Sequence, residues 1–368
     1  MALLCVGLGK DAGAELVGAT NQEVRALWVV RTSITSPAKV ANLVRRAADA
    51  GFNTLLVQVR GRGDSYFLGG AEPRAEALAN QSSDFDPLAA VLDAAKKAGL
   101  SVHAWVNVMY VWSGDQPPLD ALHLVNAKPD WLAMDSDGAR PKTSGRVEGA
   151  YACPSNPEVR AHVRSVIKDL VSRYELDGVH LDYIRYPNEH YCHCPGCLQR
   201  FAQHLGDAAN GIAAAEAPKR FAKQWTEWRR EQISTLVRDI RDDLKNSNVK
   251  LTAAVWVDVE RARDTKFQDW PRWCKEGWLD AVLPMNYAVD EATYRTHAEE
   301  AMRQAGATPV WMGIGAWRLK PEDNRKRIRI ARELGAAGIS LFSYGGLTNE
   351  GTTEKNLTAL REVLGAER

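Results

Sequence analysis

The sequence of 368 residues has no run of about 18 or more apolar residues, the length that a membrane-spanning helix needs. It also carries almost no net charge, because 47 Lys and Arg balance 46 Asp and Glu. A formal charge of +1 provides no basic surface for nucleic acid or for an anionic membrane. Six cysteines are too few for a disulfide scaffold at this length. These absences argue against a membrane span, a nucleic-acid partner and a small disulfide-rich fold.

Two further features are missing from the chain. No glycine-rich phosphate loop follows any apolar run, which disfavours a nucleotide-binding protein, and there is no internal repeat. What is abundant is apolar residues, at 45% of the chain, together with twelve tryptophans. This composition supports a large core, and the tryptophans suit either that core or stacking surfaces for sugars.

Apolar, β-branched runs alternate with amphipathic stretches along the chain. Eight runs predict strands, at residues 25–34, 53–60, 101–112, 177–186, 250–260, 279–287, 309–317 and 338–344. Helices are predicted between them, for example from Pro37 and Pro87, which follow the N-cap candidates Ser36 and Asp86. Eight strand–helix units predict an α/β protein with a single (β/α)8 barrel, here residues 25–366.

Two segments do not fit the repeating unit. Residues 1–24 precede the first strand, and they suit either the remnant of a trimmed export signal or a frayed terminus. On the first interpretation the protein is exported to the periplasm or the medium. Residues 188–221 are polar, alanine-rich and cysteine-containing, and they form an insertion after the fourth strand. A last helix is predicted at residues 353–364.

Polar and aromatic residues gather where seven of the predicted strands end. In (β/α) barrels the chemistry lies at the C-terminal ends of the strands. Each residue taken alone could be a structural or core residue, but the joint pattern predicts a ligand cleft. The candidate binding residues are Arg60, Asp64, His103, Trp105, Asn107, His180, Trp256, Asn286, Tyr287, Trp317 and Tyr344.

The segment Asp177–Pro187, DGVHLDYIRYP, resembles the signature of the glycosyl-hydrolase-like 10 family of bacterial (β/α) barrels. Four other segments resemble that family in the same order, over nearly the whole chain. They are Gln58–Asp64, His103–Asn107, Gln268–Trp270 and Pro284–Tyr287. The resemblance implies a barrel that acts on glycans, such as bacterial cell-wall or other microbial polysaccharide. One departure stands after the fifth strand, where Val257–Glu260 replaces an Arg-Asn element of the family.

Cleavage of a glycosidic bond normally requires two carboxyl groups. Asp182 is the first candidate, because a carboxyl inside an apolar strand is costly to bury without a task or a partner. We predict that it acts ionised, as nucleophile or base, with His180 hydrogen-bonded to it. Its alternative role is a structural ion pair with Arg60 or Arg185.

The second carboxyl is predicted on strand five. Asp258 is the first candidate for the general acid, with Trp256 as an apolar wall that raises its pKa, and Glu260 and Asp64 follow. No cofactor is needed for this reaction. A metal hydrolase that uses His103 and His180 is a weaker alternative, since the first strand has no His-x-His pair. A barrel that binds glycans without cleaving them is the alternative from another functional class.

Three cysteines and a histidine stand within six residues, Cys192-His193-Cys194-Pro195-Gly196-Cys197, and Cys153 could join them. Such a group can surround a structural Zn²⁺. A disulfide with a spare thiol and a set of free thiols are the alternatives. In each case the spacing predicts that the three thiols lie close together and hold a long loop near the site.

Overall fold

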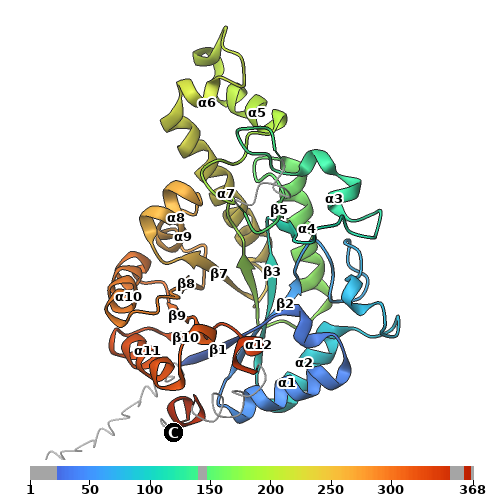
Figure 1. Cartoon of the computed structure of the whole chain (residues 1–368), viewed down its shortest axis with the longest axis vertical. Coiled ribbons are helices and arrows are strands. Elements are labelled where there is room, and N and C mark those ends of the chain that lie inside the picture. Colours follow the sequence, from blue (N-terminus) through green and yellow to red (C-terminus); the bar gives the residue numbers. More distant parts are fainter. Residues whose placement is uncertain (1–22, 140–146, 349–359, 366–368) are drawn as a thin grey trace, which may run out of the picture.

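The computed structural model describes residues 23–139, 147–348 and 360–365. Eight parallel strands in this part of the chain curl into a barrel with helices around it (Figure 1). In chain order they are β1 (Val24–Val29), β2 (Thr54–Arg60), β3 (Ser101–Asn107), β6 (Gly178–Asp182), β7 (Lys250–Trp256), β8 (Ala281–Met285), β9 (Trp311–Ile314) and β10 (Gly338–Leu341). The predicted (β/α)8 barrel is confirmed.

The strand order around the sheet is β8-β7-β6-β3-β2-β1-β10-β9. The two outer strands meet through a parallel bridge between Val282 and Val310, so the barrel is nearly closed. All eight strands lie where the sequence predicts them, but most end earlier. One of these differences affects predicted site residues. Strand β7 ends at Trp256, whereas the sequence predicted a strand that continues to Glu260.

Helices cover the outside of the barrel, and local capping explains where several of them begin. Ser36, Asp86 and Asn156 each accept a hydrogen bond from the first turn of the helix that follows, as the sequence predicts for the first two. The longer helices are α1 (Pro37–Asp49), α2 (Pro87–Ala98), α4 (Pro157–Arg173), α7 (Ala222–Leu244), α10 (Glu291–Ala305) and α11 (Pro321–Glu333). The shorter ones are α3 (Leu124–Ala127), α5 (Pro195–Leu205), α6 (Ala217–Arg220), α8 (Val259–Thr265), α9 (Trp270–Lys275) and α12 (Tyr344–Thr348).

Alternation along each strand separates two cores. On β1, Leu27 and Val29 belong to the large apolar core between the strands and the helices. Ala26 and Trp28 belong to a smaller core inside the barrel, with Trp105, Trp311 and four aliphatic residues. Three of the twelve tryptophans therefore fill the barrel interior, where a period of two along the strands places them.

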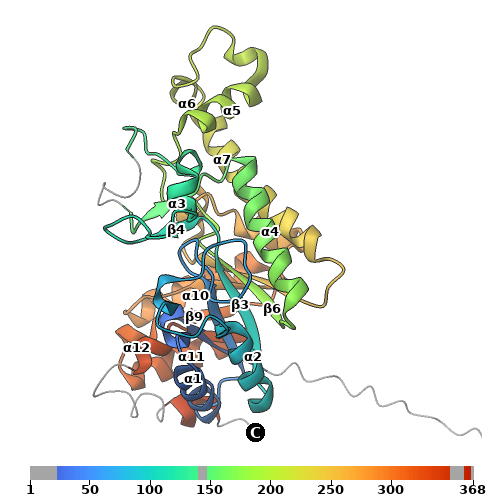
Figure 2. The same ribbon diagram turned by 90° about the vertical axis from the view of Figure 1, so that its right-hand side faces the viewer.

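Two additions follow strands β3 and β6, so both lie at the C-terminal end of the barrel. After β3 the chain forms an antiparallel pair, β4 (Tyr110–Trp112) with β5 (Ala150–Tyr151). After β6 the segment 188–221 holds α5 and α6, which project beyond the barrel beside the start of α7 (Figures 1 and 2).

Among the described helices, none combines the length and the apolar character needed to cross a bilayer. The N-terminal segment 1–22 and most of the helix predicted at 353–364 lie outside the described residues. The predicted export therefore stays a prediction.

Candidate functional site

A pocket of about 290 Å³ opens where the barrel strands end. We call it the barrel-mouth pocket. Six of the eight strands, or the loops directly after them, contribute to its wall. The lining residues are Trp28, Val30, Arg31, Gln58, Trp105, Asn107, Tyr110, Asp182, Tyr183, Arg185, Met285, Tyr287 and Phe342.

Asp182 is the last residue of β6 and is only 5% exposed, although it lines this pocket. Burial raises the pKa of its carboxyl above the ordinary 3.8, and the Arg185 guanidinium, 3.6 Å from the carboxylate, opposes this effect. A carboxyl in such a setting holds its proton to higher pH than an exposed one. The structure thus places Asp182 at the end of a strand, as predicted, but burial raises the pKa of its carboxyl, whereas the sequence suggested a carboxyl kept ionised by its neighbours.

Glu148 is a second carboxyl group close to Asp182. One nitrogen of Arg185 contacts Asp182 and the other contacts Glu148 at 3.3 Å, while Tyr151 donates a hydrogen bond of 2.8 Å to Glu148. Burial alone would raise the pKa of Glu148, but Arg185 and these hydrogen bonds lower it below the ordinary 4.5. The two carboxyl groups thus contact the same guanidinium, and glycosidases likewise use two carboxyls that face one another across the scissile bond.

The backbone beside Asp182 is strained. Tyr183 has a φ of +50°, a conformation that costs a non-glycine residue on the order of 1–2 kcal/mol. Backbone hydrogen bonds hold this turn, because Val108 donates to the Asp182 carbonyl and Met109 donates to the Tyr183 carbonyl. The turn brings the Tyr183 ring into the pocket wall, where it stacks on Tyr110 and lies 4.1 Å from the Arg185 guanidinium.

Aromatic rings form another part of the pocket wall. Trp105 packs edge-on against Trp28, and Tyr287 packs against Phe342. Trp317, 44% exposed, contacts both Tyr287 and Phe342 and so extends this surface outward. The pocket thus combines ring faces with buried polar groups, as ligand-binding clefts do.

The sequence predicts that Trp105 and at least two of Trp256, Tyr287, Trp317 and Tyr344 line one cleft; two of these five rings line the pocket and one adjoins it. Trp105 and Tyr287 are in the wall, and Trp317 packs on the outer side of Tyr287. Trp256 lies at the end of β7 under the side chains of Arg261 and Lys266, and Tyr344 is buried at the start of α12. Neither is among the residues that line the pocket.

The strand-five carboxyls are not where the sequence predicts them. Asp258 and Glu260 were expected to extend one face of the strand, but the strand ends at Trp256. Asp258 is exposed and caps α8 by accepting a hydrogen bond from the Arg261 amide, and Glu260 is exposed in the first turn of that helix. Neither lines the barrel-mouth pocket. A cap residue and a strand residue look alike when a strand runs directly into a helix.

Arg60 and Asp64 were predicted to bind the substrate, but neither lines the pocket. Each instead bonds to a neighbouring residue of the protein. Arg60 is fully buried and forms two hydrogen bonds of 2.6 and 2.7 Å with Glu72, so it is bound before any sugar arrives. Asp64 accepts a hydrogen bond from the Arg62 amide in the turn after β2. Arg60 forms no ion pair with Asp182. Of the two ion-pair partners predicted for Asp182, Arg60 and Arg185, only Arg185 contacts it.

The buried Arg60–Glu72 pair leads to a prediction about stability. Burial opposes ionisation, but Arg60 and His162 lower the pKa of Glu72 from 4.5 to about 2. A carboxyl with a depressed pKa contributes stability above its unfolded pKa, and that contribution is lost as the pH falls through about 2. At pH 7, Glu72→Ala should lower the free energy of unfolding by about 3–5 kcal/mol, measured by urea denaturation.

The matched control is Asp49→Ala, which removes an exposed ion pair with Arg45. It should cost less than about 1 kcal/mol. Equal losses for the two variants would show that the buried pair has no special role.

His103 and His180 pack against tryptophans of the barrel interior, whereas the Asn286 side chain turns toward helix α10. The His180 ring hydrogen-bonds to Thr252 at 2.8 Å and packs on Trp28, so the predicted hydrogen bond to Asp182 is wrong. Residues two apart on a strand share a face but stand in successive layers. His103 packs on Trp311, and burial lowers its pKa to about 3. Asn286 donates to the Tyr294 carbonyl.

Asn107 does line the pocket, as predicted. Its side chain accepts a hydrogen bond from the Trp105 indole and donates one to the Gly61 carbonyl. The sequence reasoning missed Glu148, Arg31, Gln58, Tyr110 and Phe342. For Arg31 and Gln58 a signal was present, since each stands at a predicted strand end, whereas Glu148 lies in a loop without periodicity.

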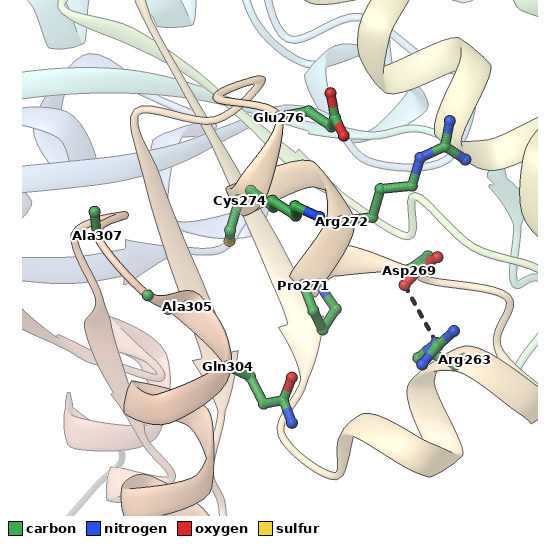
Figure 3. A pocket seen from close by; sticks show the side chains of 11 residues that line it. Arg263, Asp269, Pro271, Arg272, Cys274, Glu276, Gln304, Ala305 and Ala307 are labelled. Atoms are coloured by element: carbon green, nitrogen blue, oxygen red, sulfur yellow. Dashed lines mark ion pairs between the residues drawn. The ribbon is translucent and has the colours of Figure 1, made fainter.

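A larger cavity of about 770 Å³ lies elsewhere, between α9 and the end of α10 (Figure 3). Both of its arginines are already in ion pairs, Arg263 with Asp269 and Arg272 with Glu231. Burial raises the pKa of its one thiol, Cys274, to about 11, which makes that thiol unreactive. Size alone therefore does not identify the site, and the chemistry points to the barrel mouth.

The thiols of the insertion lie together, as predicted. The Sγ atoms of Cys153, Cys192 and Cys194 are all within 4.8 Å of one another, and Cys197 interacts with each of them. None of these four cysteines is in a disulfide.

Comparison with known proteins agrees with this geometry. Residues 23–316 match the family described as glycosyl hydrolase-like 10. The chain belongs to this family. It is 24% identical over 342 residues to the glycosyl hydrolase YngK of Bacillus subtilis, covering 83% of this chain and 62% of that protein. It is also 24% identical over 316 residues to the glycosyl hydrolase DigH of Escherichia coli K12, covering 73% and 66%. The chain thus spans under two thirds of these relatives.

Solved structures of glycoside hydrolases share the fold of this family member. The glycoside hydrolase domain of PgaB (BpsB) from Bordetella bronchiseptica superimposes with a TM-score of 0.69 at 16% identity, covering 93% of this chain and 99% of that one. The catalytic domain of a β-amylase from Paenibacillus polymyxa gives 0.64 at 12% identity, covering 94% and 99%. At such identities the likeness shows the barrel fold alone.

Proposed function

We propose that this protein hydrolyses glycosidic bonds in a polysaccharide, with Asp182 as the general acid and Glu148 as the ionised partner. The observation that carries the proposal is the pair of carboxyls bridged by Arg185, of which Asp182 lines the aromatic pocket and Glu148 lies on the outer side of Arg185, outside the pocket lining. Family membership and the names of the relatives support the class of substrate.

The two environments suit different roles. The buried, proton-retaining Asp182 would donate a proton to the leaving oxygen, and Glu148, kept ionised by Arg185 and Tyr151, would attack the anomeric carbon or activate water. Proton donation makes the sugar a better leaving group, and the ionised carboxyl stabilises the positive charge that develops on the ring. These roles replace the sequence-based proposal of an ionised Asp182 and an acid on strand five.

The pocket also indicates the kind of sugar. Arg31 lies in the wall, and its guanidinium hydrogen-bonds to Gln58 at 2.9 Å. It has no ion-pair partner among the described residues, so a carboxylate on the sugar would supply one. We therefore propose a polysaccharide with carboxylated sugars, such as bacterial cell-wall glycan, and, with such a substrate, export from the cytoplasm.

Product analysis tests this function. The purified protein is incubated with peptidoglycan strands without stem peptides, a uronic-acid polymer and neutral polymers such as chitin, and reducing ends are separated by chromatography. We expect shorter oligosaccharides from a carboxylated polymer and none with Asp182→Asn. If no polymer is cleaved while calorimetry detects binding that Trp105→Ala weakens, the non-catalytic glycan-binding barrel replaces this proposal.

The assigned roles also predict the pH dependence of kcat/KM. The rate requires Glu148 ionised and Asp182 protonated, and their pKa values are shifted down and up respectively. The rate should therefore fall at acidic pH through the pKa of Glu148, below 4.5, and fall again as the pH rises through the pKa of Asp182, above 3.8. A rate that increases as Asp182 loses its proton would instead support the ionised, nucleophilic role.

A further inference from the structure

Four buried cysteines come together from two segments far apart in the sequence. Cys153 lies between β5 and α4, whereas Cys192, Cys194 and Cys197 lie between β6 and the first turn of α5. Three of the sulfur atoms are within 4.8 Å of one another, and side-chain hydrogen bonds link Cys197 to all three. A chain pays conformational entropy to assemble four thiols at one point, so the cluster calls for a function.

Two disulfides would not explain this arrangement. Disulfides need two separate pairs, whereas each thiol here interacts with the other three. The histidine within the motif does not substitute for a thiol, because the His193 ring packs against Trp225. Four mutually close sulfur atoms from two loops are the donor set of a tetrahedral metal site.

A buried cation beside the cluster provides independent support. Arg229 is 5% exposed and donates hydrogen bonds only to the Glu189 and Tyr191 carbonyls, and its Nε has no partner in the described part of the chain. No carboxylate forms an ion pair with it among the described residues. It is close enough to Cys192 and Cys197 to feel their charge. A buried guanidinium without an ion-pair partner is costly, and thiolates in the cluster would add to the charge that Glu189 supplies from a distance.

Tyr186 points to the same conclusion. Its hydroxyl is fully buried and has no hydrogen-bond partner in the described residues. It lies within electrostatic reach of Cys153, Cys192 and Cys197. A hydroxyl in this position can donate to a thiolate, the kind of outer contact that tunes metal sites.

We propose that Cys153, Cys192, Cys194 and Cys197 bind one structural Zn²⁺ as thiolates. The four thiols release their protons to solvent on binding, and the resulting centre carries a net charge of about −2 that Arg229 partly neutralises. The metal would join the β5–α4 connection to the loop after β6. Arg185 lies on the loop after β6, and Glu148 lies just before β5, so the metal would hold the supports of both residues in register.

Metal analysis of the whole protein tests the proposal. Protein purified without added metal should contain about one zinc per chain by mass spectrometry. Cys153→Ser should lose it, whereas Cys274→Ser, which alters a buried cysteine in α9 outside the cluster, should keep it. If Cys153→Ser does not fold, titration of the intact protein with a mercurial reagent should release zinc to a chromogenic chelator as the thiols react.

Replacement of Arg229 separates a metal site from simple packing. Arg229→Gln removes the charge and should lower zinc affinity about 10- to 100-fold, and Arg229→Lys should restore part of it. Three results would each overturn the proposal. They are metal-free protein in which the four cluster thiols can be alkylated, metal-free protein in which they form two disulfides, and protein that contains iron and no zinc. Metal content is measured without any substrate, so these results do not depend on the proposed hydrolysis.

Discussion

Replacement of Asp182 by asparagine should reduce kcat about 10²- to 10⁴-fold on whichever polysaccharide the wild type cleaves. The amide keeps the shape of the side chain and can still accept the hydrogen bond from the Tyr183 backbone, but it has no proton of suitable acidity to give. Binding energy comes from the aromatic wall and the arginines, so the glycan dissociation constant should change only a few-fold. The measurement is steady-state hydrolysis together with calorimetry on the same variant.

Asp258→Asn discriminates between the two assignments of the acid. Asp258 is exposed and caps α8, and asparagine caps a helix equally well. It should therefore leave kcat within about twofold of wild type. A large loss with Asp258→Asn and normal turnover with Asp182→Asn would restore the assignment that the sequence suggested.

Glu148→Gln should cause the second large loss, also about 10²- to 10⁴-fold in kcat, because it removes the ionised partner. Glutamine can still accept the hydrogen bond from Tyr151, so the loop should keep its position. The variant should also lose the acidic limb of the pH profile, since the carboxyl whose protonation causes that limb is gone. A structural role for Glu148 would instead lower the thermal stability and leave the pH profile unchanged.

Glu260→Gln is the matched control for this substitution. Glu260 is exposed in the first turn of α8 and lines no part of the pocket, so kcat and the pH profile should stay those of the wild type. If Glu260→Gln reproduces the loss seen with Glu148→Gln, the second carboxyl belongs on the β7–α8 connection.

Much of the fold follows from local patterns in the sequence. Apolar runs of strand length, separated by helices with Ser36, Asp86 and similar caps, determine eight parallel strands, and the ends of such strands are where a site forms. The position of Asp182 follows in the same way, because a carboxyl that ends an apolar strand lies at the barrel mouth. The thiol cluster was predictable from spacing, since a few residues of turn keep three cysteines near one another.

The second carboxyl and the protonation state of the first depended on the tertiary structure. Glu148 meets Asp182 only through Arg185, a contact between loops about 35 residues apart that no local pattern encodes. The pKa of Asp182 depends on how much water the packed barrel excludes, and burial outweighs the one nearby cation. The sequence predicted that Arg60 binds the sugar, but in the structure Arg60 is paired with Glu72. The sequence by itself determined which elements form and where they end to within a few residues. Only the tertiary structure decided which charges meet, because charge–charge contacts between loops depend on distances in space and not on spacing along the chain.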